Sequence, residues 1–436
     1  FTICSFLCGN ANGIWELVAF RFLQGLGGGA LLVTSQTIIT ESYPVEKRGM
    51  AQAIYGLGVI IGPTLGPPLG GYITDHFSWP YIFYINIPIG VIATLLTLQF
   101  VRSPKYGEKS AAKDVDWLGI ALLAIAVGSL QYVLERGQDD DWFESIAIVA
   151  FSVTAVFGLF FFIWRELSFR NPIVELRVLR NGNLRVGTIL SFILGFGLYG
   201  STFIIPLYTQ ATLGWTATQS GMLMIPAALT TAFMMPIIGQ LLQRGVPQQY
   251  LVAAGMLLFF IYSFWGYKII TPDTSKDAFF WMLIVRGIGM GMLFIPITTL
   301  SLSTLKGQQI GQGASFTGMT RQLGGSFGVA TITTFLARQN MNHRSDLVSN
   351  LDINNPIVQQ RVMGMQHNLM RKGVSSDHAL KTAYQSLDFM VTKQAAVLSY
   401  MDAFLYLGVM FLVCIPFVLM VKGNKGRKID LAEASH

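Results

Sequence analysis

Long apolar runs recur along almost the whole chain, and short polar segments separate them. A helix needs about 20 predominantly apolar residues to cross the hydrocarbon core of a bilayer. Eleven of the runs are near this length, and the first is shorter, so we interpret it as the remnant of a span. The pattern predicts an all-α integral membrane fold with about twelve spans in this chain. The runs cover residues 1–8, 14–39, 50–73, 80–101, 116–134, 143–164, 186–208, 218–242, 250–267, 279–302, 313–337 and 400–421.

The composition supports a membrane protein and argues against nucleic-acid binding. The chain has 436 residues, of which 52% are hydrophobic and only 12% are charged, whereas soluble domains carry about 25% charged residues. The net charge is +7, but the basic residues are dispersed among loops and form no patch or stripe of the kind that binds nucleic acid. Because Phe1 already lies inside an apolar run, we expect the true N-terminus to be missing.

Basic residues are concentrated in every second connection between the runs. Short cytoplasmic loops of membrane proteins carry an excess of Lys and Arg, so the enriched connections and the C-terminal tail are predicted to be cytoplasmic. The opposite short loops hold only Arg136, Lys268 and Lys276. The basic residues of the enriched set are Lys47, Arg48, Arg102, Lys105, Lys109, Lys113, Arg165, Arg170, Arg177, Arg180, Arg185, Arg244, Lys306, Lys422, Lys425, Arg427 and Lys428.

The segment 338–396 is predicted to be a long extracytoplasmic loop before the last span. Its Ser376-Asp377 pair is followed by Ala379, Leu380, Ala383 and Leu387, a pattern that is typical of a capped amphipathic helix leading into that span. A solvated loop with helical turns is one interpretation of the whole segment, and a cap on which a partner docks is the other.

The run 50–73 combines glycines four residues apart with three prolines. Gly58, Gly62, Gly66 and Gly70 would form a smooth row on a helix, along which another backbone can approach closely. Pro63, Pro67 and Pro68 remove helix hydrogen bonds, which lipid tolerates only where the backbone packs on protein or lines a cavity. This span should therefore face a neighbouring helix or a transport pathway.

Three arginines lie inside apolar runs, where a charge costs about 2.5–3.5 kcal/mol on insertion scales. Arg21 has Gln24 one helical turn further on, and Arg286 and Arg321 lie in later runs. Each is a candidate for a fixed positive charge that faces the pathway and tunes a nearby acid. The alternative is an arginine that is satisfied by backbone carbonyls and only holds helices together.

Acidic residues are absent from the centres of the spans, although proton coupling normally needs an embedded carboxylate whose pKa burial can raise. The acids near span ends are Glu16, Glu41, Asp75, Asp116, Glu135 and Asp402. Either one of them carries the proton or the proton site lies in a missing N-terminal part, and we favour the second.

The sequence offers no support for an enzyme. It contains no phosphate-binding Gly-x-x-x-x-Gly-Lys-Ser/Thr loop, its Cys and His residues make no spacing typical of a metal site, and no nucleophile–base set is evident. We therefore expect no bound cofactor and no metal.

Several motifs together resemble one transporter family. Arg21-Phe-Leu-Gln24-Gly25-Leu-Gly27 is similar to the Arg-x-x-Gln-Gly-x-Gly signature of a fourth span. The series from Gly58 to Gly71 is similar to the antiporter motif of a fifth span, although Pro67-Pro68-Leu69 delays its final Gly-Gly. The remaining motifs are Asn86-Ile-Pro88-Ile-Gly90 at the start of a sixth span, Asp116-Trp-Leu-Gly119, and Leu323-Gly324 with Gly328-Val-Ala330. Jointly they resemble the major facilitator superfamily, in particular the fourteen-span drug:proton antiporters of the EmrB/QacA type.

The resemblance implies a domain organisation. Residues 1–101 would be the remainder of an N-terminal helical bundle, with family spans three to six. Residues 114–165 would be two extra linker spans, residues 182–422 a C-terminal bundle that includes loop 338–396, and residues 423–436 a cytoplasmic tail.

The resemblance also implies a function in the plasma (inner) membrane of a bacterium. It predicts export of hydrophobic or amphipathic drugs by alternating access, driven by the proton gradient alone. Arg21 and Gln24 would support proton coupling, Gly62, Pro63 and Gly66 a kink in the antiporter motif, and Asp116 the cytoplasmic end of its span. A periplasmic adaptor and an outer-membrane channel are partners implied by the family.

Two alternatives remain at this point. One is a dedicated exporter of a single metabolite, lipid precursor or siderophore, because the motifs report mechanism and not substrate. The other is a membrane sensor that keeps the fold without transport, which the lack of central acids would suit.

Overall fold

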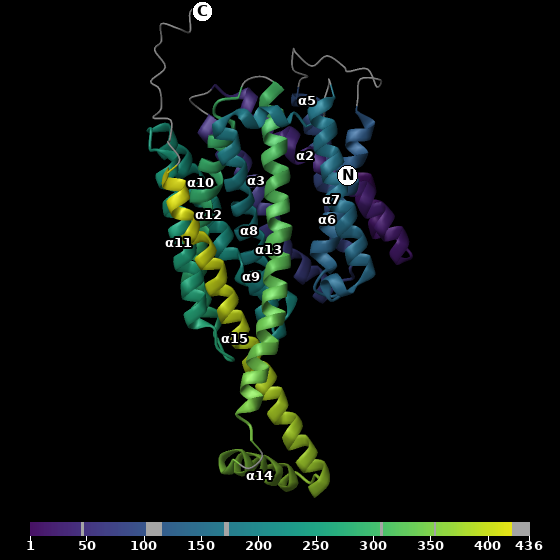
Figure 1. Ribbon diagram of the computed structural model, residues 1–436, viewed down its shortest axis with the longest axis vertical. Helices are drawn as coiled ribbons and strands as arrows, with labels where there is room; N and C mark the ends of the chain where they lie inside the picture. Colours follow the sequence, from purple (N-terminus) through teal and green to yellow (C-terminus); the bar gives the residue numbers. More distant parts are fainter. Residues whose placement is uncertain (45–47, 102–115, 170–173, 306–307, 353–354, 421–436) are drawn as a thin grey trace, which may run out of the picture.

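A computed structural model describes residues 1–44, 48–101, 116–169, 174–305, 308–352 and 355–420. Within these ranges the protein is helical and has no β-strand. Figure 1 shows a wide bundle of roughly parallel and antiparallel helices from which a narrow stalk projects at one end. The last described helix returns from the stalk to the opposite end of the bundle, where it ends at Met420.

The first helices follow the predicted runs. Apolar run 80–101 is divided, because a turn separates a short helix from the main one. Pro88 lies in the first turn of the second piece, where a missing N–H costs nothing. The helices of this part are α1 (Thr2–Gly9), α2 (Ile14–Ser42), α3 (Arg48–His76), α4 (Tyr81–Tyr84) and α5 (Asn86–Phe100).

The two predicted linker spans form an antiparallel pair, α6 (Trp117–Arg136) and α7 (Ile146–Ser168), joined through the short 3₁₀ helix η3 (Trp142–Glu144). A second short 3₁₀ helix, η4 (Leu176–Arg180), leads from this pair into the C-terminal bundle. In Figure 1 the pair stands at one side of the bundle, and α6 contacts α13.

The C-terminal part holds most of the buried core. In α8 and α12, 56% and 61% of the most apolar stretch is buried, whereas the values are 6% for α2 and 0% for α4–α5. Apolar run 218–242 is divided at Met224, before Pro226 in the first turn of the second piece. The helices are α8 (Gly182–Ala211), α9 (Ala217–Leu223), α10 (Ile225–Gln243), α11 (Gln248–Ile269), α12 (Lys276–Leu302), α13 (Gln308–Ser349), α14 (Pro356–Arg371) and α15 (Ser376–Met420).

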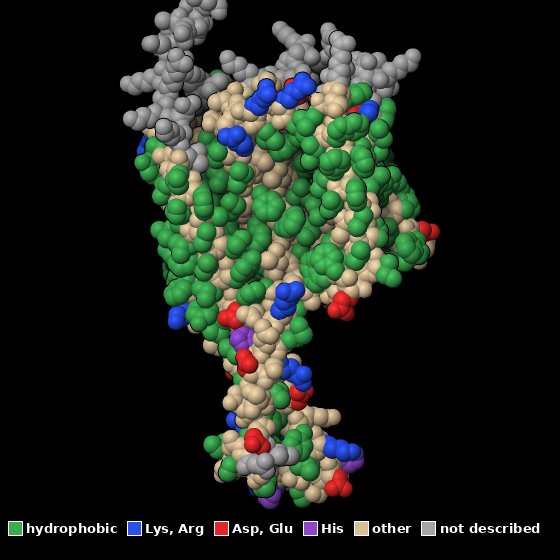
Figure 2. Space-filling model, viewed as in Figure 1, with side chains coloured by type: hydrophobic (Ala, Val, Ile, Leu, Met, Phe, Trp, Pro, Cys, Tyr) green, Lys and Arg blue, Asp and Glu red, His purple; other side chains and the backbone are tan. Residues whose placement is uncertain are grey.

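Nine of the described helical segments are long and apolar enough to cross a membrane. Helices α3 and α13 are also long enough, but their glycines, prolines and polar residues lower the mean hydropathy. With the short α1, these segments account for all of the predicted runs. Figure 2 shows a broad band of apolar side chains around the bundle, with Lys and Arg gathered at the end opposite the stalk.

The stalk corrects the prediction of a loop at 338–396. Helix α13 continues past its apolar part to Ser349, α14 lies across the tip, and α15 begins at Ser376 and runs without a break into the last span. The predicted helix start at Ser376 is confirmed, but the described part of the segment is mostly helical and not a solvated loop. A continuous helix satisfies its own backbone hydrogen bonds, so it can extend beyond the membrane without partners for the main chain.

Candidate transport pathway

The signature residues of α2 form a polar chain toward α1. Arg21 donates from Nη1 to Oε1 of Gln24 at 2.7 Å, and Gln24 in turn donates to the hydroxyl of Ser5. The Arg21 guanidinium also lies 5.7 Å from the centre of the Phe83 ring. Gln24 is buried, whereas Arg21 is exposed in the described structure. The two predicted residues are thus one hydrogen-bonded unit, and their part in proton coupling remains a prediction.

The glycine row of α3 does not contact a neighbouring helix in the described structure, so the other predicted alternative, that it faces a transport pathway, remains a prediction. A methyl group added at Gly58, Gly62, Gly66 or Gly70 would meet no atom within 4 Å. The close approach uses the neighbouring face of the helix. A methyl group at Gly71 would lie 2.6 Å from the carbonyl carbon of Ala217, and one at Gly221 would lie 2.5 Å from the nitrogen of Pro68.

Helix α3 is therefore brought against α9 by Pro67, Pro68 and Gly71. This contact joins the N-terminal bundle to the C-terminal bundle. Residues 60–64, which include Pro63, lie within the single helix α3. The predicted kink at Gly62, Pro63 and Gly66 remains a prediction.

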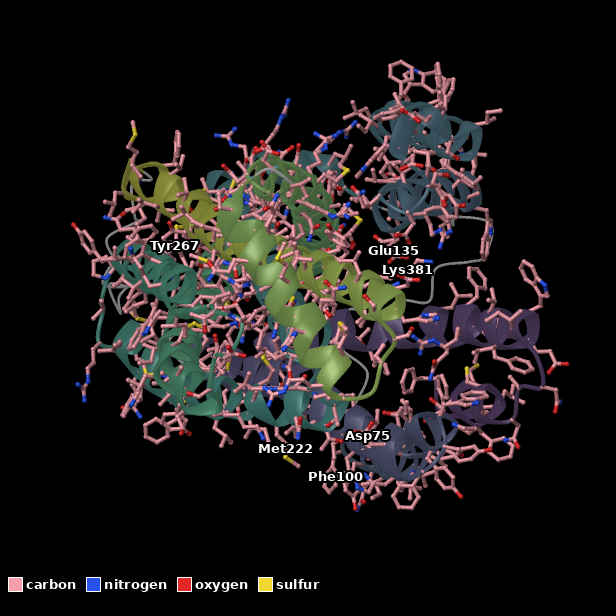
Figure 3. The ribbon with its side chains drawn as sticks, turned by 90° about the horizontal axis from the view of Figure 1, so that it is seen from below. Asp75, Phe100, Glu135, Met222, Tyr267 and Lys381 are labelled. Atoms are coloured by element: carbon pink, nitrogen blue, oxygen red, sulfur yellow. The ribbon has the colours of Figure 1, made fainter. Side chains whose placement is uncertain are left out.

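Asp75 strengthens the same contact at the stalk end. Its carboxylate accepts hydrogen bonds from the backbone N–H of Thr218 at 3.2 Å and from the Thr218 hydroxyl at 2.5 Å. These bonds hold the pKa of the exposed Asp75 carboxyl below its usual range. Figure 3, seen from the stalk end, labels Asp75 and Met222 of α9 at this border between the two bundles.

Arg321 lies where four helices from both bundles meet. Arg321, on α13, is 8% exposed, and its guanidinium lies beside the hydroxyl of Tyr55 on α3 and 5.0 Å from the centre of the Phe294 ring on α12. The Tyr55 hydroxyl donates in turn to the carbonyl of Leu32 on α2 at 3.1 Å. In the described part of the chain, no carboxylate pairs with Arg321. It is therefore a buried positive charge held at the boundary between the bundles by an aromatic ring and a phenol.

Arg286 has a different environment. Its side chain on α12 is 5% exposed and donates to the hydroxyls of Ser201 at 2.9 Å and Thr202 at 2.6 Å, both on α8. These contacts lie within the C-terminal bundle. For Arg286 this geometry favours the interpretation in which the arginine holds helices together. It does not test a role of Arg286 in the transport pathway.

A buried amide cluster between α2 and α3 was missed by the sequence reasoning. Gln52 donates to the hydroxyl of Thr40 at 2.6 Å, and Gln36 donates to Gln52 at 3.4 Å. All three side chains are almost fully buried. The signal was present, because a glutamine inside an apolar run needs a partner in lipid, but its partner could not be chosen from the sequence.

Asp116 caps the start of α6 and joins it to α7. Its carboxylate accepts a hydrogen bond from the N–H of Gly119 at 3.0 Å, which caps the start of α6. It also receives two donors of Arg165 on α7, each at 3.0 Å. Gly119 is needed because a methyl group there would lie 2.9 Å from the Asp116 carboxylate. One acidic residue thus fixes the beginning of α6 and joins it to the end of α7.

The second glycine motif packs α13 directly against the backbone of α8. A methyl group at Gly324 or Gly328 of α13 would collide with the carbonyl oxygens of Phe192 and Phe196 on α8. Gly195 of α8 faces the carbonyl of Arg321 in the same way. The smooth groove expected from glycines four apart is therefore present on α13, where it packs against α8.

The remaining predicted residues lie at helix ends. Asn86 begins α5, and Pro88 lies in its first turn. Another of the acids near span ends, Asp402 of α15, lies 2.7 Å from the ring nitrogen Nε2 of His343 on α13. Among the described residues, no three His, Cys, Asp or Glu side chains are placed to hold a metal ion.

These features define a membrane transporter built of two helical bundles with polar residues at their boundary. Residues 1–329 match the Major Facilitator Superfamily. The fatty acid resistance protein FarB of Neisseria gonorrhoeae is 32% identical over 97% of this chain and 81% of its own length. The multidrug export protein EmrB of Escherichia coli is 32% identical over 97% of this chain and 80% of its own length. The colistin resistance protein EmrB of Acinetobacter baumannii is 27% identical over 98% of this chain and 82% of its own length.

The chain therefore belongs to the Major Facilitator Superfamily, in its EmrB-like branch of drug:proton antiporters.

Proposed function

We propose that this protein exports hydrophobic and amphipathic compounds in exchange for protons. The observation that carries the proposal is the 32% identity to the multidrug export protein EmrB over 97% of the chain. The relatives are named for different compounds, including fatty acids and colistin. This variety favours a broad substrate range over a dedicated exporter or a sensor without transport.

The bundle boundary supports alternating access. Helix α3 contacts α9 at the stalk end through Pro68, Gly71 and Asp75. Deeper in the bundle, Tyr55 of α3 contacts Arg321 of α13. A rocking motion of the bundles about a central site would break and remake these contacts. Arg321 then places a fixed charge at the moving boundary, while Arg21 and Gln24 support the transfer of protons driven by the membrane gradient, without a bound cofactor.

The distribution of charge supports an orientation. The described basic residues of the enriched connections, among them Arg165, Arg177 and Arg244, belong to the end opposite the stalk, where Lys and Arg gather in Figure 2. The positive-inside rule then places this end and the C-terminus in the cytoplasm and the stalk outside the bacterial inner membrane. The predicted residues Lys47, Arg102, Lys105, Lys109, Lys113, Arg170 and Lys306 and the basic residues of the tail lie outside the described ranges.

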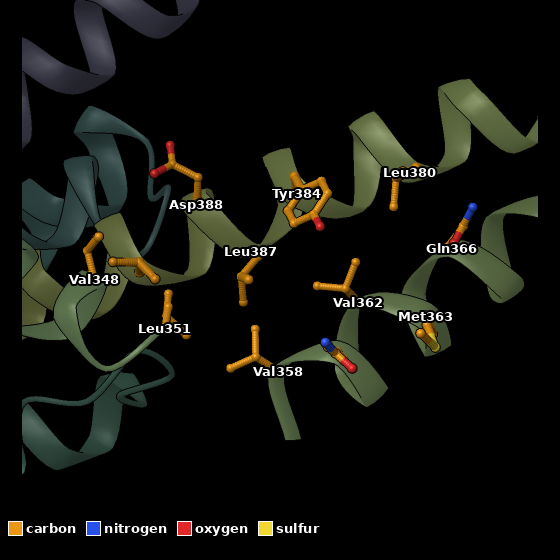
Figure 4. A pocket seen from close by; sticks show the side chains of 12 residues that line it. Val348, Leu351, Val358, Val362, Met363, Gln366, Leu380, Tyr384, Leu387 and Asp388 are labelled. Carbon is orange, nitrogen blue, oxygen red and sulfur yellow. The ribbon is translucent and has the colours of Figure 1, made fainter. Parts of the chain in front are cut away.

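The stalk supports a protein partner. Three apolar side chains of the stalk are exposed beyond the apolar band: Ile357 by 74%, Phe389 by 69% and Met363 by 61%. A cavity of about 490 Å³ opens between α14 and α15, with Val358, Val362 and Leu387 on its walls (Figure 4). Clustered apolar side chains on a water-facing surface mark interaction sites. A periplasmic adaptor that leads to an outer-membrane channel is the partner that we propose for this surface.

Everted membrane vesicles test the transport. The full-length gene is expressed in a pump-deficient bacterium, the vesicle lumen is acidified, and a hydrophobic dye, an amine or a medium-chain fatty acid is added singly. Proton release that depends on the protein, and that falls about tenfold or more in Arg21→Ala, is the expected result. A folded protein that gives no proton release with any compound would exclude the multidrug function.

A comparison of cells with vesicles tests the partner. The double variant Ile357→Ser and Met363→Ser should lower drug resistance of intact cells while leaving transport by everted vesicles unchanged, because only the cell contains the partner. The control is Lys372→Ser, a polar change on the same stalk. Equal resistance of the double variant and the control would argue against docking at this surface.

A further inference from the structure

A second cavity lies at the other end of the molecule, between the linker spans and the C-terminal bundle. Its volume is about 430 Å³, within the range of sites for drug-sized ligands. Four elements form its walls: α6, the segment of η4, the start of α8 and the first turns of α13. The lining residues are Leu123, Val174, Glu175, Val178, Leu179, Leu184, Gly311, Gln312, Ser315, Phe316 and Met319.

Most of this lining is apolar and is supported from behind. Val178 and Leu179 pack on a small cluster of buried side chains that includes Leu184 and Leu305. The segment that carries Glu175 is held to α7, because the N–H of Val174 donates to the Glu166 carboxylate at 3.3 Å. The α13 wall from Gly311 to Met319 covers about 12 Å at 1.5 Å per residue. That depth is most of the half-thickness of a bilayer core, which is about 15 Å.

Two side chains of the lining, Gln312 and Glu175, have acceptor oxygens that receive no hydrogen bond from the described residues. The Oε1 atom of Gln312 is buried without a hydrogen-bond partner. Glu175, half-buried, forms no ion pair or side-chain hydrogen bond with any residue that the structure describes. Arg177 and Arg180 of η4 are exposed and do not line the cavity. A ligand that supplied a cationic donor would satisfy the carboxylate, whereas an anionic head would be repelled by it.

From this arrangement we propose that the cavity binds an amphiphile with an ammonium head, its apolar part against Leu123, Phe316 and Met319 and its head at Glu175. The cavity runs along α13 from η4, which precedes the span α8, so with η4 at the membrane surface such a ligand would enter from one leaflet of the lipid. Exported amines and aminophospholipids share this chemistry. The role of the cavity in collecting compounds for export rests on the proposed function, but the binding itself does not.

Photolabelling tests the site directly. The full chain is placed in phosphatidylglycerol nanodiscs and labelled with a dodecylammonium probe that carries a diazirine at the end of its chain. Mass spectrometry should find the label in peptides covering 174–184 and 311–319. Loss of one charge-assisted contact is worth about tenfold in affinity, so Glu175→Gln should lower labelling about tenfold, and Glu175→Asp should retain more of it.

Two variants separate binding from misfolding. Ser315→Phe fills the cavity without changing its charge and should also abolish labelling. Glu135→Gln, an acid at the other end of α6, should label as the wild type does. Labelling that is unchanged in Glu175→Gln, or equal labelling by dodecyl phosphate with the same diazirine, would overturn the proposal.

Competition identifies the natural occupant. A fall in labelling when phosphatidylethanolamine is added assigns the site to the lipid. A fall caused only by an amine that the protein exports assigns it to the exported compound, and competition by neither overturns the proposal. Labelling needs no proton gradient, so the two proposals fail separately. If the cavity does not bind the probe, proton release by uncharged compounds should still be seen. If the protein does not export any compound, labelling of the cavity should still be seen.

Discussion

The carboxylate of Asp75 receives both the backbone N–H and the hydroxyl of Thr218, 143 residues further along the chain. This pair joins the end of α3 to the start of α9, and hence the N-terminal bundle to the C-terminal bundle. Because Pro68 and Gly71 already bring the two backbones together there, the hydrogen bonds hold the bundles closed at the stalk end.

A disulfide across this border should stop transport. In a variant that lacks the native Cys4, Cys8 and Cys414, the changes Asp75→Cys and Thr218→Cys would lock the bundles on oxidation. Proton release by everted vesicles should fall at least tenfold and return on reduction. The matched control joins Tyr199 to Gln322, which are hydrogen-bonded at 3.0 Å between α8 and α13. Transport that survives a complete Asp75–Thr218 cross-link would show that this contact does not open.

The Asp75–Thr218 contact should not respond to pH in the physiological range. The pKa of Asp75 is lowered from its usual value of 3.8. The carboxylate is therefore ionised and keeps its hydrogen bonds at every pH above 3.8. They are lost only when the pH falls through the lowered pKa. In a variant that lacks the native cysteines and keeps Asp75 and Thr218, the rate at which the thiol of Met222→Cys, on the same helix α9, reacts with a water-soluble maleimide should therefore be constant between about pH 5 and 8, after correction for thiol ionisation. A stepwise rise in that interval would refute this assignment.

The packing of α13 on α8 should tolerate no side chain at Gly324. An added methyl group would overlap the carbonyl of Phe192, and forced overpacking costs about 1–3 kcal/mol. Gly324→Ala should lower the midpoint of thermal unfolding in detergent. Gly318→Ala, on the same helix with nothing within 4 Å, is the control.

Gly66→Ala should resemble that control, because the glycine row of α3 faces open space in the described structure. A large loss of stability there would restore the original prediction of a close backbone contact.

Removing the charge of Asp116 should destabilise the linker spans. The carboxylate is fully buried, caps α6 and receives two donors of Arg165. Breaking such a pair leaves a partly buried arginine without a partner, at a cost of about 3 kcal/mol. Asp140→Asn removes a more exposed partner of Arg136 at the other end of α6 and should cost less than about 1 kcal/mol. Equal unfolding midpoints for the two variants would contradict the anchoring role.

The two buried arginines should separate stability from transport. Arg321→Gln should lower proton release about tenfold or more with a normal unfolding midpoint, because its partners Tyr55 and Phe294 lie on different helices at the bundle boundary. Arg286→Gln should mainly lower the midpoint, because Ser201 and Thr202 then lose donors inside one bundle. The reverse outcome would exchange the two assignments.

The sequence by itself determined which segments are helical. The length of each apolar run fixed the spans, because lipid requires the backbone to satisfy its own hydrogen bonds. The start of α15 at Ser376 and the cap at Asp116 could also be predicted, since both depend on neighbours within four residues.

Only the tertiary structure decided which face of each span touches which neighbour. A helix in lipid is apolar on every side, so its pattern carries little information about the face that packs. Hence the sequence could not decide whether the glycine row at Gly58–Gly70 faces a helix or a pathway. In the structure this row is open, while Gly324 and Gly328 make the close approach. For the same reason Arg286 and Arg321 look alike in sequence, and only their distant partners distinguish a link within one bundle from a charge between two.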